Sequence, residues 1–194
     1  MALKHYCDYR DTVDLDAWWE GQPRSETESL IHETMAQVAK RHGWDLNLRA
    51  WSDTKSYELR QGRKKVFCFQ ISRRTLALDP PGESAWAPVM IETFRDNLGA
   101  KMNALVERGA PRDFLDVEAV CSRGLADPAT CWSLWSRKNP GRSVREAQLR
   151  VLHLLQLIEA RRPLDAIADS KDQAAAQVLR DWVRESFCKA GVQP

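Results

Sequence analysis

The hydrophobic pattern of this chain changes period near residue 93, and this change restricts the folds that it can adopt. Before it, the segment 45–51 alternates apolar and polar residues, which is typical of a strand with one buried face. After it, apolar residues recur at helical spacing, and we expect helices over about 94–108, 112–123, 128–137, 144–161 and 172–189. The pattern predicts an α+β protein, with an N-terminal mixed sheet and a C-terminal helical region.

Turn and cap residues place the elements of the N-terminal region. We expect a strand from Val13 to Trp19, and then a helix over about 26–42 that begins at a capping box of Ser25 and Glu28. Gly43 fits the C′ position of that helix because glycine adopts the left-handed conformation readily.

Two further strands are expected over 56–60 and 65–72, with Gly62 in the turn between them, and a short strand over 74–79. We therefore predict a sheet region over residues 1–92 and a helical region over residues 93–194, packed as one compact unit.

Composition places the chain among ordinary globular proteins. Of its 194 residues, 43% are hydrophobic and 29% are charged. No apolar run is long enough to cross a membrane, and the N-terminus lacks a secretory hydrophobic core. We expect a cytoplasmic protein with no membrane partner. The five cysteines form no C-x-x-C pair and are odd in number, which argues against a disulfide framework and favours small buried side chains.

The first candidate site is the acidic pair Asp14 and Asp16. In a strand, residues two apart share one face, so these carboxylates point away from Val13 and Leu15. Two neighbouring carboxylates repel each other, and a Mg²⁺ ion between them would offset that cost. The alternative is the solvated polar face of an edge strand.

The second candidate site lies in a predicted helix–turn–helix over residues 96–117. Lys101 is on the first helix, and Asp113 and Asp116 lie one turn apart on the second, where they can share a face. An exposed lysine and a structural aspartate at a helix N-terminus are the alternatives. Asp96, at the start of the first helix, is expected to cap it.

Taken in order, these motifs resemble the AbiEii/AbiGii toxin family of nucleotidyltransferases. The resemblance covers roughly residues 1–142. It rests on Arg-x-Thr-x-Asp-Leu-Asp at 10–16, the lysine helix, Arg-Asp-Phe-Leu-Asp at 112–116, and Trp-Ser-Leu-Trp-Ser-Arg-Lys-Asn-Pro-Gly at 132–141. It implies a nucleotidyltransferase-like sheet and a Mg²⁺-dependent transfer of NMP from an NTP to an RNA acceptor (such as tRNA) or a protein acceptor. Such a protein would act as the toxin of a bacterial toxin–antitoxin or phage-defence (abortive infection) system, with a cognate antitoxin.

The resemblance also implies roles for individual residues. Asp14 and Asp16 would hold Mg²⁺, and Lys101 would hold phosphate. Asp113 would support the site or act as a base, with Asp116 as the second candidate. The nucleotide would also contact Arg10, Thr12 and Arg112, although simple turn chemistry is the alternative for Arg10 and Thr12, and a salt bridge to a carboxylate for Arg112.

The chain departs from the family at two positions. The Gly-Gly/Ser-Thr/Ser element that cradles the triphosphate is not evident before the acidic strand. Gln70 stands where many such folds have a third carboxylate, which Glu92 or Asp79 could replace. These departures favour an alternative from another class, a catalytically silent protein of the same fold that binds RNA or a partner protein.

Overall fold

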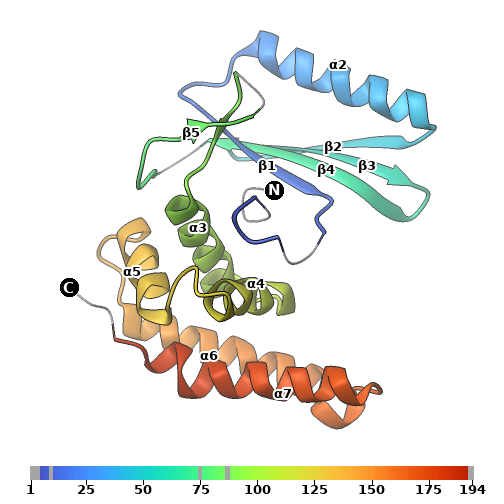
Figure 1. Cartoon of the computed structure of the whole chain (residues 1–194). Coiled ribbons are helices and arrows are strands. Elements are labelled where there is room, and N and C mark those ends of the chain that lie inside the picture. The colour runs from blue at the N-terminus through green and yellow to red at the C-terminus, as the bar shows by residue number, and fades with distance from the viewer. Residues whose placement is uncertain (1–4, 9–10, 74–75, 86–87, 192–194) are drawn as a thin grey trace. The chain divides into compact units, whose positions relative to one another are not determined.

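The computed structural model describes residues 5–8, 11–73, 76–85 and 88–191 of the chain (Figure 1). The chain divides into two compact units, residues 1–77 and residues 78–194. The first unit contains a four-stranded mixed sheet and one long helix, whereas the second is mainly helical. This arrangement confirms the predicted α+β class.

The sheet of the first unit has the strand order β1-β4-β3-β2. Strands β2 (Asp45–Trp51), β3 (Thr54–Gln61) and β4 (Lys64–Arg73) form an antiparallel meander. Strand β1 (Asp14–Trp19) lies at the edge, where it pairs in parallel with β4. The strands predicted between residues 13 and 72 are therefore present, and Gly62 occupies the turn between β3 and β4 with a φ of 59°.

Helix α2 (Ser25–His42) covers the apolar face of this sheet (Figure 1). Its buried residues pack with sheet residues in one core cluster: Met35, Ala39, Tyr57, Leu59 and Ile71. Gly43 ends the helix as predicted, with a φ of 65° and its amide directed at the last carbonyl groups. The predicted capping box is wrong, because Arg24 is the N-cap and Ser25 already belongs to the helix.

The opposite face of the sheet is polar. The register aligns Asp14 with Cys68 and Asp16 with Gln70. Two cross-strand contacts lie on this face. The Ser56 hydroxyl is 3.3 Å from the Cys68 thiol, and the hydroxyl groups of Thr54 and Ser72 are 2.9 Å apart.

The second unit begins with a two-stranded sheet of β5 (Gly82–Glu83) and β6 (Met90–Ile91). Five helices follow: α3 (Phe94–Glu107), α4 (Pro111–Ser122), α5 (Pro128–Lys138), α6 (Val144–Arg161) and α7 (Ser170–Glu185). Short 3-10 turns occur at Leu164–Ala166 and Phe187–Lys189. The predicted helices agree with these closely, apart from the last, which ends at Glu185.

The short strand predicted over 74–79 is wrong where it can be compared. Residues 74 and 75 lie outside the described residues, and 76–79 are irregular. The amides of Leu78 and Asp79 donate to the carboxylate of Asp96 at 2.8 and 2.9 Å. These two amides therefore bond to a side chain instead of a neighbouring strand.

Aromatic side chains fill the core of the helical unit. Trp132 and Trp135 are fully buried, as is Phe187, and the indole N–H of Trp132 donates to the Phe187 carbonyl at 2.8 Å. These two tryptophans are therefore packing residues of the helical core. Among the described residues, no helix is both long and apolar enough to span a membrane.

Candidate functional site

Asp14 and Asp16 project from the same face of β1 in the first unit. Asp16 is exposed, whereas Asp14 is half-buried and its Oδ1 lies 2.7 Å from the Nζ atom of Lys65. The Thr12 hydroxyl accepts a hydrogen bond from the Asp14 amide at 3.2 Å. This local contact is of the kind expected if Thr12 serves in a turn, which was the alternative to a nucleotide contact. Arg10 lies outside the described residues.

The neighbouring strands add no third carboxylate next to this pair. The register places Gln70 beside Asp16, as the sequence indicated. Glu58 follows one strand further, aligned with Cys68, but its carboxylate pairs with Arg60. In the part of the chain that the structure describes, no three His, Cys, Asp or Glu residues converge as a metal site.

The donors that are present nevertheless suit Mg²⁺, which prefers oxygen ligands. Two carboxylates are a sufficient protein contribution, because Mg²⁺ commonly keeps several waters and binds substrate phosphates. The ammonium group of Lys65 would compete with the ion for Asp14, since both are cations and need the same oxygen atom.

In the second unit, the structure brings together Lys101, Asp113 and Asp116. The Nζ atom of Lys101 lies 2.7 Å from Oδ2 of Asp116 and 3.7 Å from Oδ1 of Asp113. Both aspartates are completely buried, and the lysine side chain is 18% exposed. The two aspartates therefore share a face of α4, as their spacing predicted, and that face is directed toward α3.

Asp113 has a further cationic partner in Arg108. The guanidinium group donates two hydrogen bonds to the carboxylate, at 2.8 and 2.9 Å, and the amide of Ala110 donates a third at 3.1 Å. Burial alone would raise the pKa of Asp113, but Arg108, with help from Lys101 and this amide, holds it below its ordinary value. The charged form of Asp113 is thus favoured, and its carboxylate also caps the start of α4 through the Ala110 amide. Arg112 is exposed.

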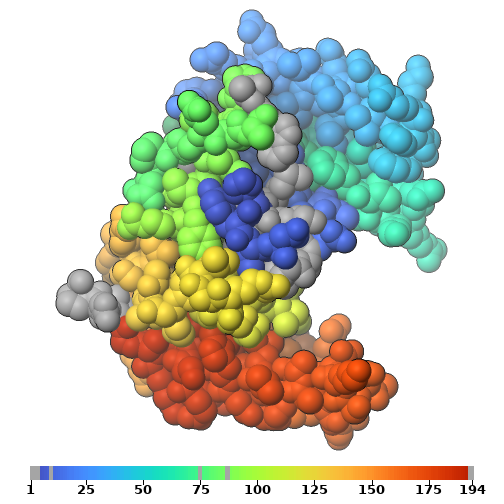
Figure 2. Space-filling model, viewed as in Figure 1, coloured from blue at the N-terminus to red at the C-terminus, as the bar shows by residue number. Residues whose placement is uncertain are grey.

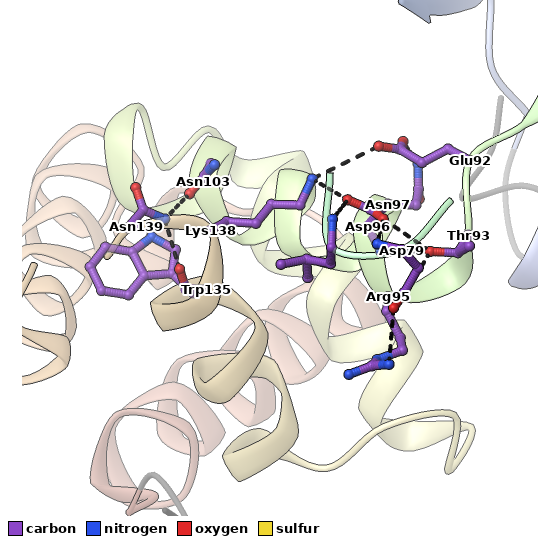
Figure 3. Close-up of polar contacts among 11 residues, drawn as sticks. Asp79, Glu92, Thr93, Arg95, Asp96, Asn97, Asn103, Trp135, Lys138 and Asn139 are labelled. Atoms are coloured by element: carbon purple, nitrogen blue, oxygen red, sulfur yellow. Dashed lines mark hydrogen bonds and ion pairs between the residues drawn. The ribbon is translucent and has the colours of Figure 1, made fainter. Parts of the chain in front are cut away.

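A second buried ionic cluster joins α3 and α5 (Figure 3). The Nζ atom of Lys138 lies 2.8 Å from Oδ1 of Asp96 and 3.9 Å from Oε1 of Glu92. Burial opposes the charge on Asp96. The hydrogen bond from Lys138 and those from the amides of Leu78 and Asp79 nevertheless lower its pKa to about 2.

Asp96 is not the N-cap residue of α3, although its place in the first turn agrees with the predicted contact with the helix dipole. The N-cap of α3 is Thr93, whose hydroxyl accepts from the Asp96 amide, and the Asp96 carboxylate binds the loop amides and Lys138 instead. Asp96 lies in the first turn, where a carboxylate also favours the helix dipole.

Lys138 lies in the sequence near two other basic residues, Arg137 and Arg142, but its own side chain is only 7% exposed. Helical spacing contained a signal for this burial, because Lys138 follows Cys131 and Trp135 on the buried stripe of α5. Gly99 makes room for the lysine, since a Cβ atom at that position would lie 3.0 Å from Cδ of Lys138.

The candidate residues thus form two sets. Asp14, Asp16 and Thr12 belong to the sheet unit, and Lys101, Arg112 and Asp113 belong to the helical unit. Comparison of the chain with protein-family models, with curated proteins and with solved structures found no match. A functional hypothesis for this protein therefore rests on its own residues.

Proposed function

We propose that this protein is a Mg²⁺-dependent nucleotidyltransferase that transfers NMP from an NTP to an RNA or protein acceptor. We propose further that it serves as the cytoplasmic toxin of a bacterial toxin–antitoxin or phage-defence system. The observation that supports this most strongly is the pair of carboxylates, Asp14 and Asp16, on one face of β1. The electrostatic repulsion between two carboxylates on one face destabilises the protein, and binding of a divalent cation offsets this repulsion.

In this proposal the two acidic pairs have different tasks. Asp14 and Asp16 hold the ion, which neutralises the charge that develops on the leaving pyrophosphate. Asp113 is a poor general base, because its lowered pKa weakens its hold on a proton. Its task is to position Lys101, with the help of Asp116.

Lys101 can serve the nucleotide only by changing partners. Its ammonium group is held by Asp116 at 2.7 Å, and a triphosphate would have to compete with that carboxylate. An ammonium group on a flexible stem suits such an exchange, because it acts as a point charge without a fixed hydrogen-bonding plane.

A second candidate function is a silent protein of this fold that binds RNA or a partner protein. The specific observation in its favour is Lys65, which neutralises Asp14 without a metal ion. Gln70 beside Asp16 favours the same alternative, because an amide contributes no charge to a cation site.

Isothermal titration calorimetry with each of the four NTPs, with and without Mg²⁺, distinguishes the two functions. The enzyme hypothesis predicts Mg²⁺-dependent binding by the wild type that Asp14→Asn and Asp16→Asn abolish. Glu20→Gln, which changes an exposed carboxylate just beyond β1, is the matched control and should bind as the wild type does.

Circular dichroism must show that the variants keep their secondary structure. The same two variants should lose toxicity when expressed in bacteria. Wild-type protein that is folded but binds no NTP would contradict the enzyme hypothesis and support the binding protein, as would full toxicity of both variants.

A further inference from the structure

Two cysteine thiols lie in contact between α4 and α5. Cys121 is in the last turn of α4, Cys131 is in the second turn of α5, and their Sγ atoms are 3.8 Å apart. The two cysteines are not a C-x-x-C motif, because the end of α4, the connection and the start of α5 separate them in the sequence. Both thiols are free in the structure.

The two thiols differ in their access to solvent. Cys131 is fully buried, whereas Cys121 is half-buried and lines an open cavity of about 510 Å³ together with Ser122, Thr130 and Trp182. The segment around the α4–α5 connection lies on the visible face of the molecule in Figure 2 (yellow). A small solute can therefore reach Cys121 first.

We propose that Cys121 and Cys131 are a thiol–disulfide pair that a peroxide oxidises. The Cys121 thiolate attacks one peroxide oxygen and breaks the O–O bond, which leaves a sulfenic acid on Cys121 and releases water after proton uptake. The Cys131 sulfur then attacks the Cys121 sulfur, a disulfide forms, and the hydroxyl group leaves as a second water with the thiol proton. Two thiols lose two electrons in total, and the peroxide gains them.

The local structure suits this order of events. The hydrogen bond to Cys121 and burial both raise the pKa of Cys131, which disfavours its thiolate and makes the solvent-accessible Cys121 the first of the two thiols to react with peroxide. Cys131 is nevertheless in contact with the sulfur that it must attack.

The sulfur atoms must approach from 3.8 Å to about 2.05 Å for the bond to form. Cys121 is one residue from the end of α4, and the following connection contains Gly124 at a φ of 68° with open space around it. The chain can therefore adjust there without displacing the core. The bond would join the helix that carries Asp113 to the helix that carries Lys138. This inference rests on the thiols alone and is independent of the proposed function.

The test is treatment of the full chain with hydrogen peroxide, followed by alkylation, proteolysis and mass spectrometry. We expect a peptide cross-linked between Cys121 and Cys131, with a mass lower by two hydrogen atoms, that dithiothreitol separates. In Cys131→Ser the reaction should stop at a sulfenic acid on Cys121, which dimedone traps. In Cys121→Ser, residue 131 should remain a thiol.

Cys188→Ser is the matched control, because burial also raises the pKa of Cys188, to about 12, yet we assign it no partner in this reaction. This variant should form the cross-link as the wild type does. Wild-type protein in which both thiols can still be alkylated after peroxide would overturn the proposal, and so would sulfinic acid on Cys121 without a cross-link. These outcomes are read from the wild type, so they do not depend on how well the variants fold.

Discussion

Replacing Asp96 with asparagine removes the charge that Lys138 contacts and keeps the size of the side chain. Asp96 is completely buried and the Lys138 side chain is 7% exposed, so the ammonium group cannot recover its hydration in the folded state. Removal of one partner of a buried ion pair costs about 3–5 kcal/mol, because the other charge remains uncompensated. Glu92, at 3.9 Å, retains part of the compensation, and we therefore expect a loss of about 3 kcal/mol.

The substitution also destabilises the fold by removing a hydrogen-bond acceptor. The Leu78 amide donates to Oδ1 of Asp96 and the Asp79 amide donates to Oδ2, whereas asparagine offers one oxygen and one NH₂ group. One of the two loop amides must lose its acceptor. Together the two contributions amount to about 4 kcal/mol, which for a helical unit of this size corresponds to a decrease in Tm of roughly 15 °C.

The assay is urea and thermal unfolding followed by tryptophan fluorescence, which reports on the buried Trp132 and Trp135. Glu185→Gln, which disrupts the exposed Lys189–Glu185 pair, is the control and should change stability very little. In the double variant Asp96→Asn with Lys138→Met, the loss should be smaller than the sum of the single losses. A loss below about 1 kcal/mol for Asp96→Asn, or additive losses in the double variant, would refute the reasoning.

Three further predictions concern the same unit. Gly99→Ala should not raise the free energy of unfolding by the roughly 1 kcal/mol that alanine normally adds in a helix, because its Cβ atom would press on the side chain of Lys138. In a Lys138→Ala background, the same substitution should be stabilising. Between pH 4 and pH 2 the free energy of unfolding of the wild type should fall by about 2 kcal/mol more than that of Asp96→Asn in urea titrations. The reason is that the pKa of Asp96 is about 2 in the folded state, below its unfolded value, so the ionised carboxylate stabilises the fold at higher pH and this stabilisation is lost as the pH falls through the folded pKa. Trp132→Phe should cost about 1–3 kcal/mol in the same assay, because the buried Phe187 carbonyl loses its donor; an unchanged unfolding midpoint would contradict this.

The periodic elements of this fold could be predicted from sequence because their signals are local. The alternation over 45–51, the glycines at 43 and 62, and the helical spacing after residue 93 each depend on neighbouring residues alone. The capping box failed for a local reason as well, since a one-residue difference in where α2 begins makes Ser25 the first helical residue instead of the cap. The strand over 74–79 failed because its amides bond to a carboxylate that arrives from α3.

The candidate site shows the same division between local and distant information. The shared face of Asp14 and Asp16, and that of Asp113 and Asp116, follow from the periods of a strand and a helix. The cationic partners of these groups do not follow from them, because Lys65 reaches Asp14, and Arg108 reaches Asp113, through chain geometry that the pattern does not encode. Burial of Lys138 could have been inferred from its place on the stripe of α5, but the identity of its partner could not.

The edge position of β1 has a consequence for the order in which the sheet forms and opens. Strands β2, β3 and β4 are joined by tight turns and can pair as soon as each is made, whereas β1 must wait for a partner from the far end of the unit. The same strand has one neighbour to hold it, so it belongs among the first segments to detach in transient opening of the native state. The carboxylate pair therefore takes its place in the sheet late in folding, and the residues most important for the proposed chemistry are on an edge strand that has one neighbour to keep it in place.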